Sequence, residues 1–188
     1  MRILGIDPGL QTTGYGVIDV GPGGVRVVEA GVIRSAEART ETTDMAPRLK
    51  ALYDGLVEVL DQCRPGVIAV EQLYAHYEHP RTAILMGHAR GVFFLAGAQR
   101  GLDVLSYNAT AVKKSVSGHG RASKEQMQHT IMRELGLAKL PEPHDVSDAL
   151  AVALCHHYRT ASSLTSGGRT VRFQGVNRAM LGVDPDGE

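Results

Sequence analysis

The opening stretch MRILGIDPGLQTTGYGVIDV constrains the fold more than any other part of this chain. Arg2–Ile6 is a short apolar run of strand-forming residues that leads directly into Asp7. Pro8-Gly9 must end that strand in a turn, because proline fixes φ and glycine permits positive φ. The extended pattern resumes over Thr13–Ile18, which predicts a hairpin. Asp7 therefore stands at a strand end, where α/β proteins bind ligands, although an Asp before Pro-Gly is also ordinary turn chemistry.

Alternating and helical patterns divide the rest of the chain. Strands are predicted at 2–7, 14–20, 25–34, Val67–Val70 and Leu102–Tyr107. Helices are predicted from the caps Thr42-Thr43-Asp44 to Cys63, from Pro80, from Asn108 or Thr110, from Ser123 to Leu135, and from His144. With right-handed crossovers, this order predicts an α/β fold: a mixed five-stranded sheet, three antiparallel strands followed by parallel crossovers, with helices on both faces. We expect one domain over residues 1–160 and a flexible tail over 161–188.

The charge of the chain is balanced overall but unevenly distributed. Lys and Arg number 20, as do Asp and Glu, which argues against a histone-like or tail-driven nucleic-acid binder. Bases nevertheless outnumber acids between Ala111 and Leu140, and such a region can lie along phosphates. No apolar run is long enough to cross a bilayer and the start does not resemble a signal peptide, so we expect no membrane association and a cytoplasmic location. Cys63 and Cys155 fit no metal spacing.

Four carboxylates stand where predicted elements begin or end. Asp7 and Glu71 directly follow strands, and Asp145 and Asp148, which share one helix face at a spacing of three, open the last helix. Such a group repels itself unless cations separate its members, and oxygen ligands of this kind suit Mg²⁺ or Mn²⁺. Two such ions make a phosphodiester-cleaving site. Taken singly, each residue has another explanation, such as helix capping or a salt-bridged strand end.

Five blocks of the chain together resemble a known family. They are GIDPGLQTTGYGVI, VIAVEQLY, LMGHARG, VKKSVSGHGRASKEQMQ and DVSDALAVALCHH, and in this order and spacing they are similar to the RuvC Holliday-junction resolvases of bacteria. The resemblance runs from Met1 to about Tyr158. It implies a ribonuclease-H-like nuclease domain, a homodimer, and paired symmetric nicks across four-way DNA junctions during homologous recombination and DNA repair. It also implies cooperation with the RuvA–RuvB branch-migration complex.

The resemblance also assigns roles to the acidic residues. Asp7, Glu71, Asp145 and Asp148 fall on the family's four catalytic positions, where they would hold two ions of Mg²⁺ or Mn²⁺. Some members of the family have histidine at the third position. Here Asp145 holds that position, so His144 stays open between a metal-facing or water-handling role and that of a solvated neighbour.

The basic and aromatic residues receive roles in the same way. Lys113 and Lys124 fall on family lysines near the scissile phosphate and join the catalytic set. Tyr74 falls where the family often has an aromatic that stacks at the junction, and a surface loop aromatic is the alternative. The residues expected to bind DNA are therefore Tyr74, Lys113, Lys114, His119, Arg121 and Lys124, against the alternative of a solvated positive face.

Three other functions are alternatives to junction resolution. A sugar-kinase or actin-like ATPase needs a second nucleotide lobe, which 188 residues cannot hold. A nuclease of the related YqgF type acting on RNA and a non-catalytic junction-binding protein remain alternatives. The helix predicted from Pro80, PRTAILMGHARGVFFLAGAQR, is rich in small residues, which indicate either tight packing on the sheet or a subunit contact. The cleavage consensus, the choice between Mg²⁺ and Mn²⁺, the geometry of the dimer and the role of the tail are not determined by the sequence.

Overall fold

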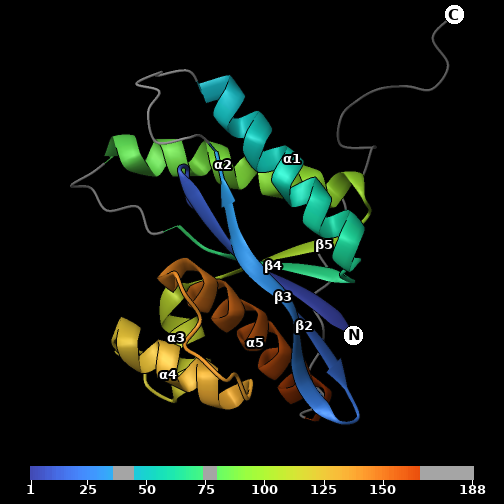
Figure 1. Cartoon of the computed structure of the whole chain (residues 1–188), viewed down its shortest axis with the longest axis vertical. Coiled ribbons are helices and arrows are strands. Elements are labelled where there is room, and N and C mark those ends of the chain that lie inside the picture. The colour runs from blue at the N-terminus through green and yellow to red at the C-terminus, as the bar shows by residue number, and fades with distance from the viewer. Residues whose placement is uncertain (36–44, 74–79, 166–188) are drawn as a thin grey trace, which may run out of the picture.

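The computed structural model describes residues 1–35, 45–73 and 80–165, which fold around one mixed five-stranded sheet (Figure 1). In spatial order the strands are β3 (Gly24–Arg34), β2 (Thr12–Gly21), β1 (Arg2–Asp7), β4 (Val67–Glu71) and β5 (Asp103–Tyr107). β1, β2 and β3 are antiparallel, whereas β4 runs parallel to both β1 and β5. The predicted α/β class and mixed sheet are confirmed.

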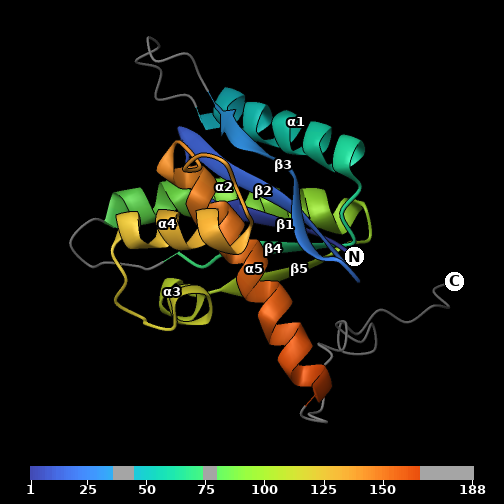
Figure 2. The ribbon, with the colours of Figure 1, turned by 60° about the horizontal axis from the view of Figure 1, so that its bottom comes forward.

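Helices cover both faces of the sheet, as predicted (Figures 1 and 2). One face carries α1 (Met45–Cys63) and α2 (Pro80–Gln99), and the other carries α5 (His144–Thr165) with α3 (Ala109–Ser117) and α4 (Lys124–Glu134) packed against it. No helix within these described ranges is long and apolar enough to span a membrane.

The last helix is longer than the sequence suggested. It continues to Thr165, beyond the expected domain boundary at residue 160. The hydroxyl of Thr160 donates to the carbonyls of His156 and His157 within the helix. Ala161 and Ser162 are exposed, and the sequence there shows no apolar periodicity that would predict a helix. The division into a domain and a tail stays a prediction, because 166–188 lie outside the described residues.

The side chains of β1 alternate between two separate cores. Leu4 and Ile6 are fully buried with α1 and α2, while Ile3 is buried against α5. Since successive strand residues point to opposite faces, Gly5 and Asp7 share the face of Ile3. Asp7 therefore points toward the side of the sheet that α5 covers.

Glycines let α5 approach the backbone of this sheet face. A Cβ atom added at Gly5 would lie 2.0 Å from the carbonyl oxygen of Ala149 in α5. One added at Gly14, the register partner of Asp7 on β2, would lie 2.0 Å from the carbonyl oxygen of Asp145. Any side chain at either position would displace the helix. The first turn of α5 is thereby held beside the strand end that carries Asp7.

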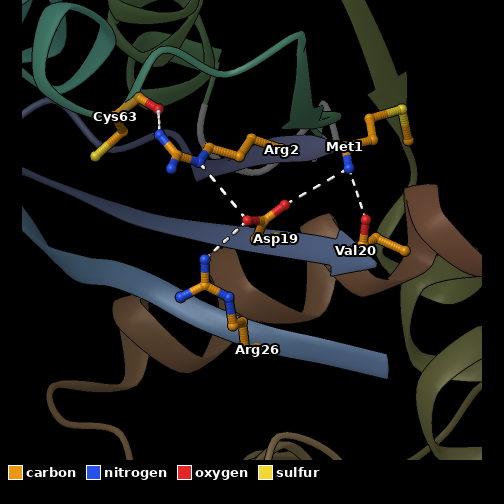
Figure 3. A network of polar contacts seen from close by, with 6 residues as sticks. All are labelled: Met1, Arg2, Asp19, Val20, Arg26 and Cys63. Carbon is orange, nitrogen blue, oxygen red and sulfur yellow. Dashed lines mark hydrogen bonds and ion pairs between the residues drawn. The ribbon is translucent and has the colours of Figure 1, made fainter. Parts of the chain in front are cut away.

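The opposite end of β1 is fixed by a polar network around Asp19 (Figure 3). The N-terminal ammonium of Met1 lies 3.5 Å from the Asp19 carboxylate, and the guanidinium of Arg26 lies 3.0 Å from it. Arg2 lies 3.9 Å from the same carboxylate and donates to the carbonyl of Cys63 at 2.6 Å. Each exposed pair contributes little stability alone, but together they hold the register of β1 against β2 and tie β1 to the end of α1.

Candidate functional site

Asp7 and Glu71 leave the sheet side by side. β1 and β4 are adjacent parallel strands in which Ile6 is the register partner of Val70, so the residues that follow these partners lie at the same edge. Both strands are fully buried just before the acids. The carboxylates of Asp7 and Glu71 therefore follow buried apolar residues directly and lie at the carboxyl edge of the sheet.

The N-terminal end of α5 supplies the other two acids, Asp145 in its first turn and Asp148 one turn later. Asp145 and Asp148 are half-buried and share a helix face, while Val146 and Ser147 between them are buried. The close contact between Gly14 and the Asp145 backbone sets the height of this turn above β2. As a result, the charges of all three other acids act on Asp7.

Two capped helices carry the lysines toward the same place. The side-chain oxygen of Asn108 accepts from the amide of Ala111 at 2.7 Å and starts α3, which bears Lys113. Ser123 and Gln126 cap each other's backbone amides in a capping box that starts α4 at Lys124. Both caps fix where a helix begins, and thus where each lysine projects.

All of these acids and lysines except Asp145 line one open cavity of about 280 Å³. Its polar lining consists of Asp7, Glu71, Asp148, Lys113 and Lys124, and its apolar lining, called the apolar floor below, of Ala109, Val112, Met127 and Ala151. The cavity therefore combines acids that could hold cations with bases that could hold a phosphate.

The acids in this cavity are difficult to ionise. Burial, followed by the negative charges of Glu71, Asp148 and Asp145, raises the pKa of Asp7 to about 8. Burial and the charge of Asp148 raise the pKa of Glu71 to about 7. Burial likewise raises the pKa of Asp148, against the opposing positive charge of Lys124. No ion pair among the described residues involves these acids, although the charges of Lys113 and Lys124 act on Glu71 from a greater distance.

This donor set fits a hard divalent cation. Carboxylate oxygens are the ligands that Mg²⁺ and Mn²⁺ prefer, and a cation would relieve the repulsion that raises the pKa of Asp7 and Glu71. In the arrangement observed, no three acidic, histidine or cysteine side chains of the described residues are grouped closely enough to hold an ion. Mutual repulsion favours such a separation, since like charges lower their energy by moving apart.

The remaining predicted residues lie around the cavity. His144 is the exposed first residue of α5; its charge acts on Asp148, but it does not line the cavity. His119 and Arg121 are exposed and line a separate open groove of about 750 Å³ beside the start of α4. Lys114 is exposed and lines neither. Tyr74 lies outside the described residues.

Sequence reasoning missed the apolar floor and the glycine contacts. Val112 and Met127 are buried helix residues with no mark that separates them from other core residues. The glycines did carry a signal, because Gly14 and Gly16 alternate within a strand, where glycine is unfavourable unless another backbone approaches.

Comparison with known proteins assigns the family. A sequence model of the family described as crossover junction endodeoxyribonuclease RuvC matches residues 3–156, which include all four acids and both lysines. The chain belongs to the RuvC family. Membership identifies it as an endodeoxyribonuclease and implies dependence on a divalent metal.

Individual relatives agree with this assignment. A RuvC crossover junction endodeoxyribonuclease of Rhodopirellula baltica is 49% identical over 156 residues, which cover 83% of this chain and 85% of that protein. The structure of Thermus thermophilus RuvC matches with a TM-score of 0.77 at 31% identity, covering 87% of this chain and 97% of that one. The same protein in complex with a Holliday junction substrate gives a TM-score of 0.78 at 30% identity, covering 87% and 96%. These similarities confirm the expected ribonuclease-H-like fold.

The acid cluster predicts an unusual dependence of stability on pH. In the folded protein the pKa of Asp7 is about 8 and that of Glu71 about 7, whereas unfolded carboxyls ionise near pH 4. The folded state therefore binds more protons between these values, and its stability falls as pH rises through that window. With a chelator present to remove metal ions, urea denaturation should give a lower free energy of unfolding at pH 8 than at pH 5. We expect a difference on the order of a few kcal/mol.

Two variants provide the comparison. Asp7→Asn should flatten this pH dependence, because it removes the group with the largest shift. Asp54→Asn, at an exposed position on α1, should leave it unchanged. Equal pH slopes in the wild type and Asp7→Asn would show that the acids are not coupled as described.

Proposed function

We propose that this chain resolves four-way DNA junctions by metal-dependent hydrolysis of phosphodiester bonds at the cavity between Asp7, Glu71 and Asp148. The observation that carries the proposal is the coupling of unpaired carboxylates at the sheet edge, facing Lys113 and Lys124 across one cavity, in a chain of the RuvC family. The products would be strands with 5′ phosphates and 3′ hydroxyls, formed by paired symmetric nicks in homologous recombination and repair.

The acids and lysines divide the work. Asp7, Glu71, Asp145 and Asp148 would hold two ions of Mg²⁺ or Mn²⁺. Such ions supply an activated water and stabilise the charge that develops on the attacked phosphate and the leaving oxygen. Lys113 and Lys124 would hold the scissile phosphate, which is supported by their place in the lining of the same cavity and by the action of their charges on Glu71.

A wider surface would guide the DNA arms. Lys114 is exposed on α3, and His119 and Arg121 are exposed ahead of α4. The charges of Lys114 and Arg121 and the ring nitrogens of His119 support contacts with phosphates outside the cavity. Tyr74 stays a proposed stacking residue on the basis of the family resemblance alone. The cytoplasm is the proposed compartment, and RuvA–RuvB the proposed partner complex.

The alternatives receive less support. A YqgF-type nuclease acting on RNA is not favoured, because the family model and the relatives all describe junction endodeoxyribonucleases. A non-catalytic junction binder is not favoured either, because every acid expected of the site is present.

The catalytic role of the acids can be separated from DNA binding. Asp7→Asn and Asp148→Asn should abolish cleavage of a synthetic four-way junction in Mg²⁺, because each removes a charged ligand. Junction affinity should survive in Ca²⁺, since the basic surface is intact. The exposed Asp54→Asn serves as the control and should cut normally. Cleavage by either site variant at the wild-type rate would refute the site, and equal cutting of linear duplex would refute junction selectivity.

Adjacent lysines provide a matched pair for the phosphate contact. Lys113 lines the cavity and Lys114 does not. Lys113→Ala should lower the single-turnover cleavage rate roughly hundred-fold, the size typical of one lost group that stabilises transition-state charge. Lys114→Ala should chiefly weaken junction binding and reduce its salt dependence. Equal losses of rate in the two variants would remove Lys113 from the catalytic set.

We also propose that the chain acts as a homodimer through α2. Ile84 and Leu95 are large apolar residues with 62% and 54% of their surface exposed. Gly87 and Gly91 lie on the same helix face, and a Cβ added to either meets no atom within 4 Å. Glycines on an open apolar face permit close approach of a second backbone, and two copies would supply the two active sites that paired nicks need.

Substitution of this face should dissociate the dimer. Leu95→Glu introduces a charge into the proposed contact, and Gly91→Leu introduces bulk. Both should shift the monomer–dimer equilibrium toward monomer in sedimentation velocity. The control Gln62→Glu, at an exposed position of α1, should not. An equilibrium unchanged in both α2 variants would reject this interface.

A further inference from the structure

Two buried polar side chains outside the cavity connect the elements that build it. The hydroxyl of Tyr107, the last residue of β5, lies 2.7 Å from Nδ1 of His156 in α5. Tyr107 is 9% exposed and His156 4% exposed. Their rings meet edge to face, with centroids 5.8 Å apart and planes at 78°. The guanidinium of Arg159 lies 5.7 Å from the centre of the Tyr107 ring.

The two side chains share one buried hydrogen bond. Burial lowers the pKa of His156 and raises the pKa of Tyr107, so it favours the neutral form of both groups. The tautomer of His156 sets the direction of the bond, and the hydroxyl donates where Nδ1 carries no proton. A buried bond of this kind is costly to break, because its polar atoms would be left without this partner in an apolar environment.

Tyr107 adjoins the catalytic elements on two sides. It is the register partner of Glu71, and its carbonyl accepts from the amide of Gln72 at 2.7 Å. The next residue, Asn108, caps the helix that bears Lys113. His156 belongs to the same helix as Asp148. The bond thus joins the strand end beside Glu71 and the start of α3 to α5.

We propose that Tyr107 and His156 are positioning residues for phosphodiester cleavage. Their hydrogen bond sets Glu71 and Lys113 at the correct height relative to Asp148, so that acids from the sheet and from α5 face one another across the cavity. Neither residue lines that cavity, and neither touches the scissile phosphate. The inference rests on the proposed function, because positioning has meaning only for a site that cleaves.

Three variants and one control test this role. Tyr107→Phe removes the hydroxyl and keeps the ring. His156→Leu removes the acceptor, and His156→Asn restores an acceptor close to the position of Nδ1. Tyr158→Phe is the matched control, because Tyr158 also lies on α5 and its hydroxyl makes a 2.8 Å bond to Glu134 at the surface, away from the cavity.

Tyr107→Phe and His156→Leu should lower the single-turnover cleavage rate roughly ten-fold with unchanged junction affinity, since small displacements of reacting groups are costly. His156→Asn should recover most of the rate, and Tyr158→Phe should match the wild type. In the protein alone, hydrogen exchange at the Gln72 amide should accelerate in Tyr107→Phe, because its acceptor carbonyl is no longer held.

Two results would overturn the inference while leaving the proposed function intact. One is a Tyr107→Phe variant that melts at a lower temperature but cleaves at the wild-type rate, which is the signature of a purely structural bond. The other is a His156→Asn variant as slow as His156→Leu. A wild-type protein that fails to cleave the junction overturns the proposed function and this inference with it.

Discussion

The contact between the backbone of α5 and the glycines of β1 and β2 is the constraint on which the site depends. At Gly5 and Gly14 no side chain fits beneath the helix, and at Gly16 an added Cβ would lie 2.6 Å from the side chain of Leu150. The middle of α5 is apolar, and every residue from Ala149 to Cys155 is buried. The acids of α5 are Asp145 and Asp148, which lie near its start. Close packing of the helix on the sheet brings them to the end of β1.

The stabilising contacts of the central strands stop short of the site. Two apolar cores, one on each face of the sheet, support β1 and β4 up to the residues just before Asp7 and Glu71. The network around Asp19 secures the far end of β1 (Figure 3). The buried acids lower the stability of the fold, because burial and mutual repulsion disfavour their charged forms. A cluster of buried acids that destabilises the fold is typical of a functional site, here one that can bind cations.

The sequence was sufficient for much of this account. Two strands end in Asp7 and Glu71, and the last helix begins with Asp145 and Asp148. Once the order of the strands is known, this pattern predicts that the four carboxylates lie close together. The difference between Lys113 and Lys114 was not predictable, because neighbouring helix residues diverge by about a quarter turn and only the packing of α3 decides which one faces the cavity. The bond between Tyr107 and His156 was also missed, since it joins residues 49 positions apart whose types are common in any core. The end of α5 at Thr165 was not predictable, because the Ser- and Thr-rich sequence beyond Arg159 has little apolar periodicity.

We infer that these carboxylates form one divalent-metal site. Crystals soaked in Mn²⁺ and measured at the manganese absorption edge test this inference, because anomalous density locates the ions without reference to activity. We expect two peaks in the cavity, each within bonding distance of carboxylate oxygens from Asp7 and at least one of Glu71, Asp145 and Asp148. Saturating Mn²⁺ with no peak in this cavity, or with peaks only at other acids of the surface, would contradict it.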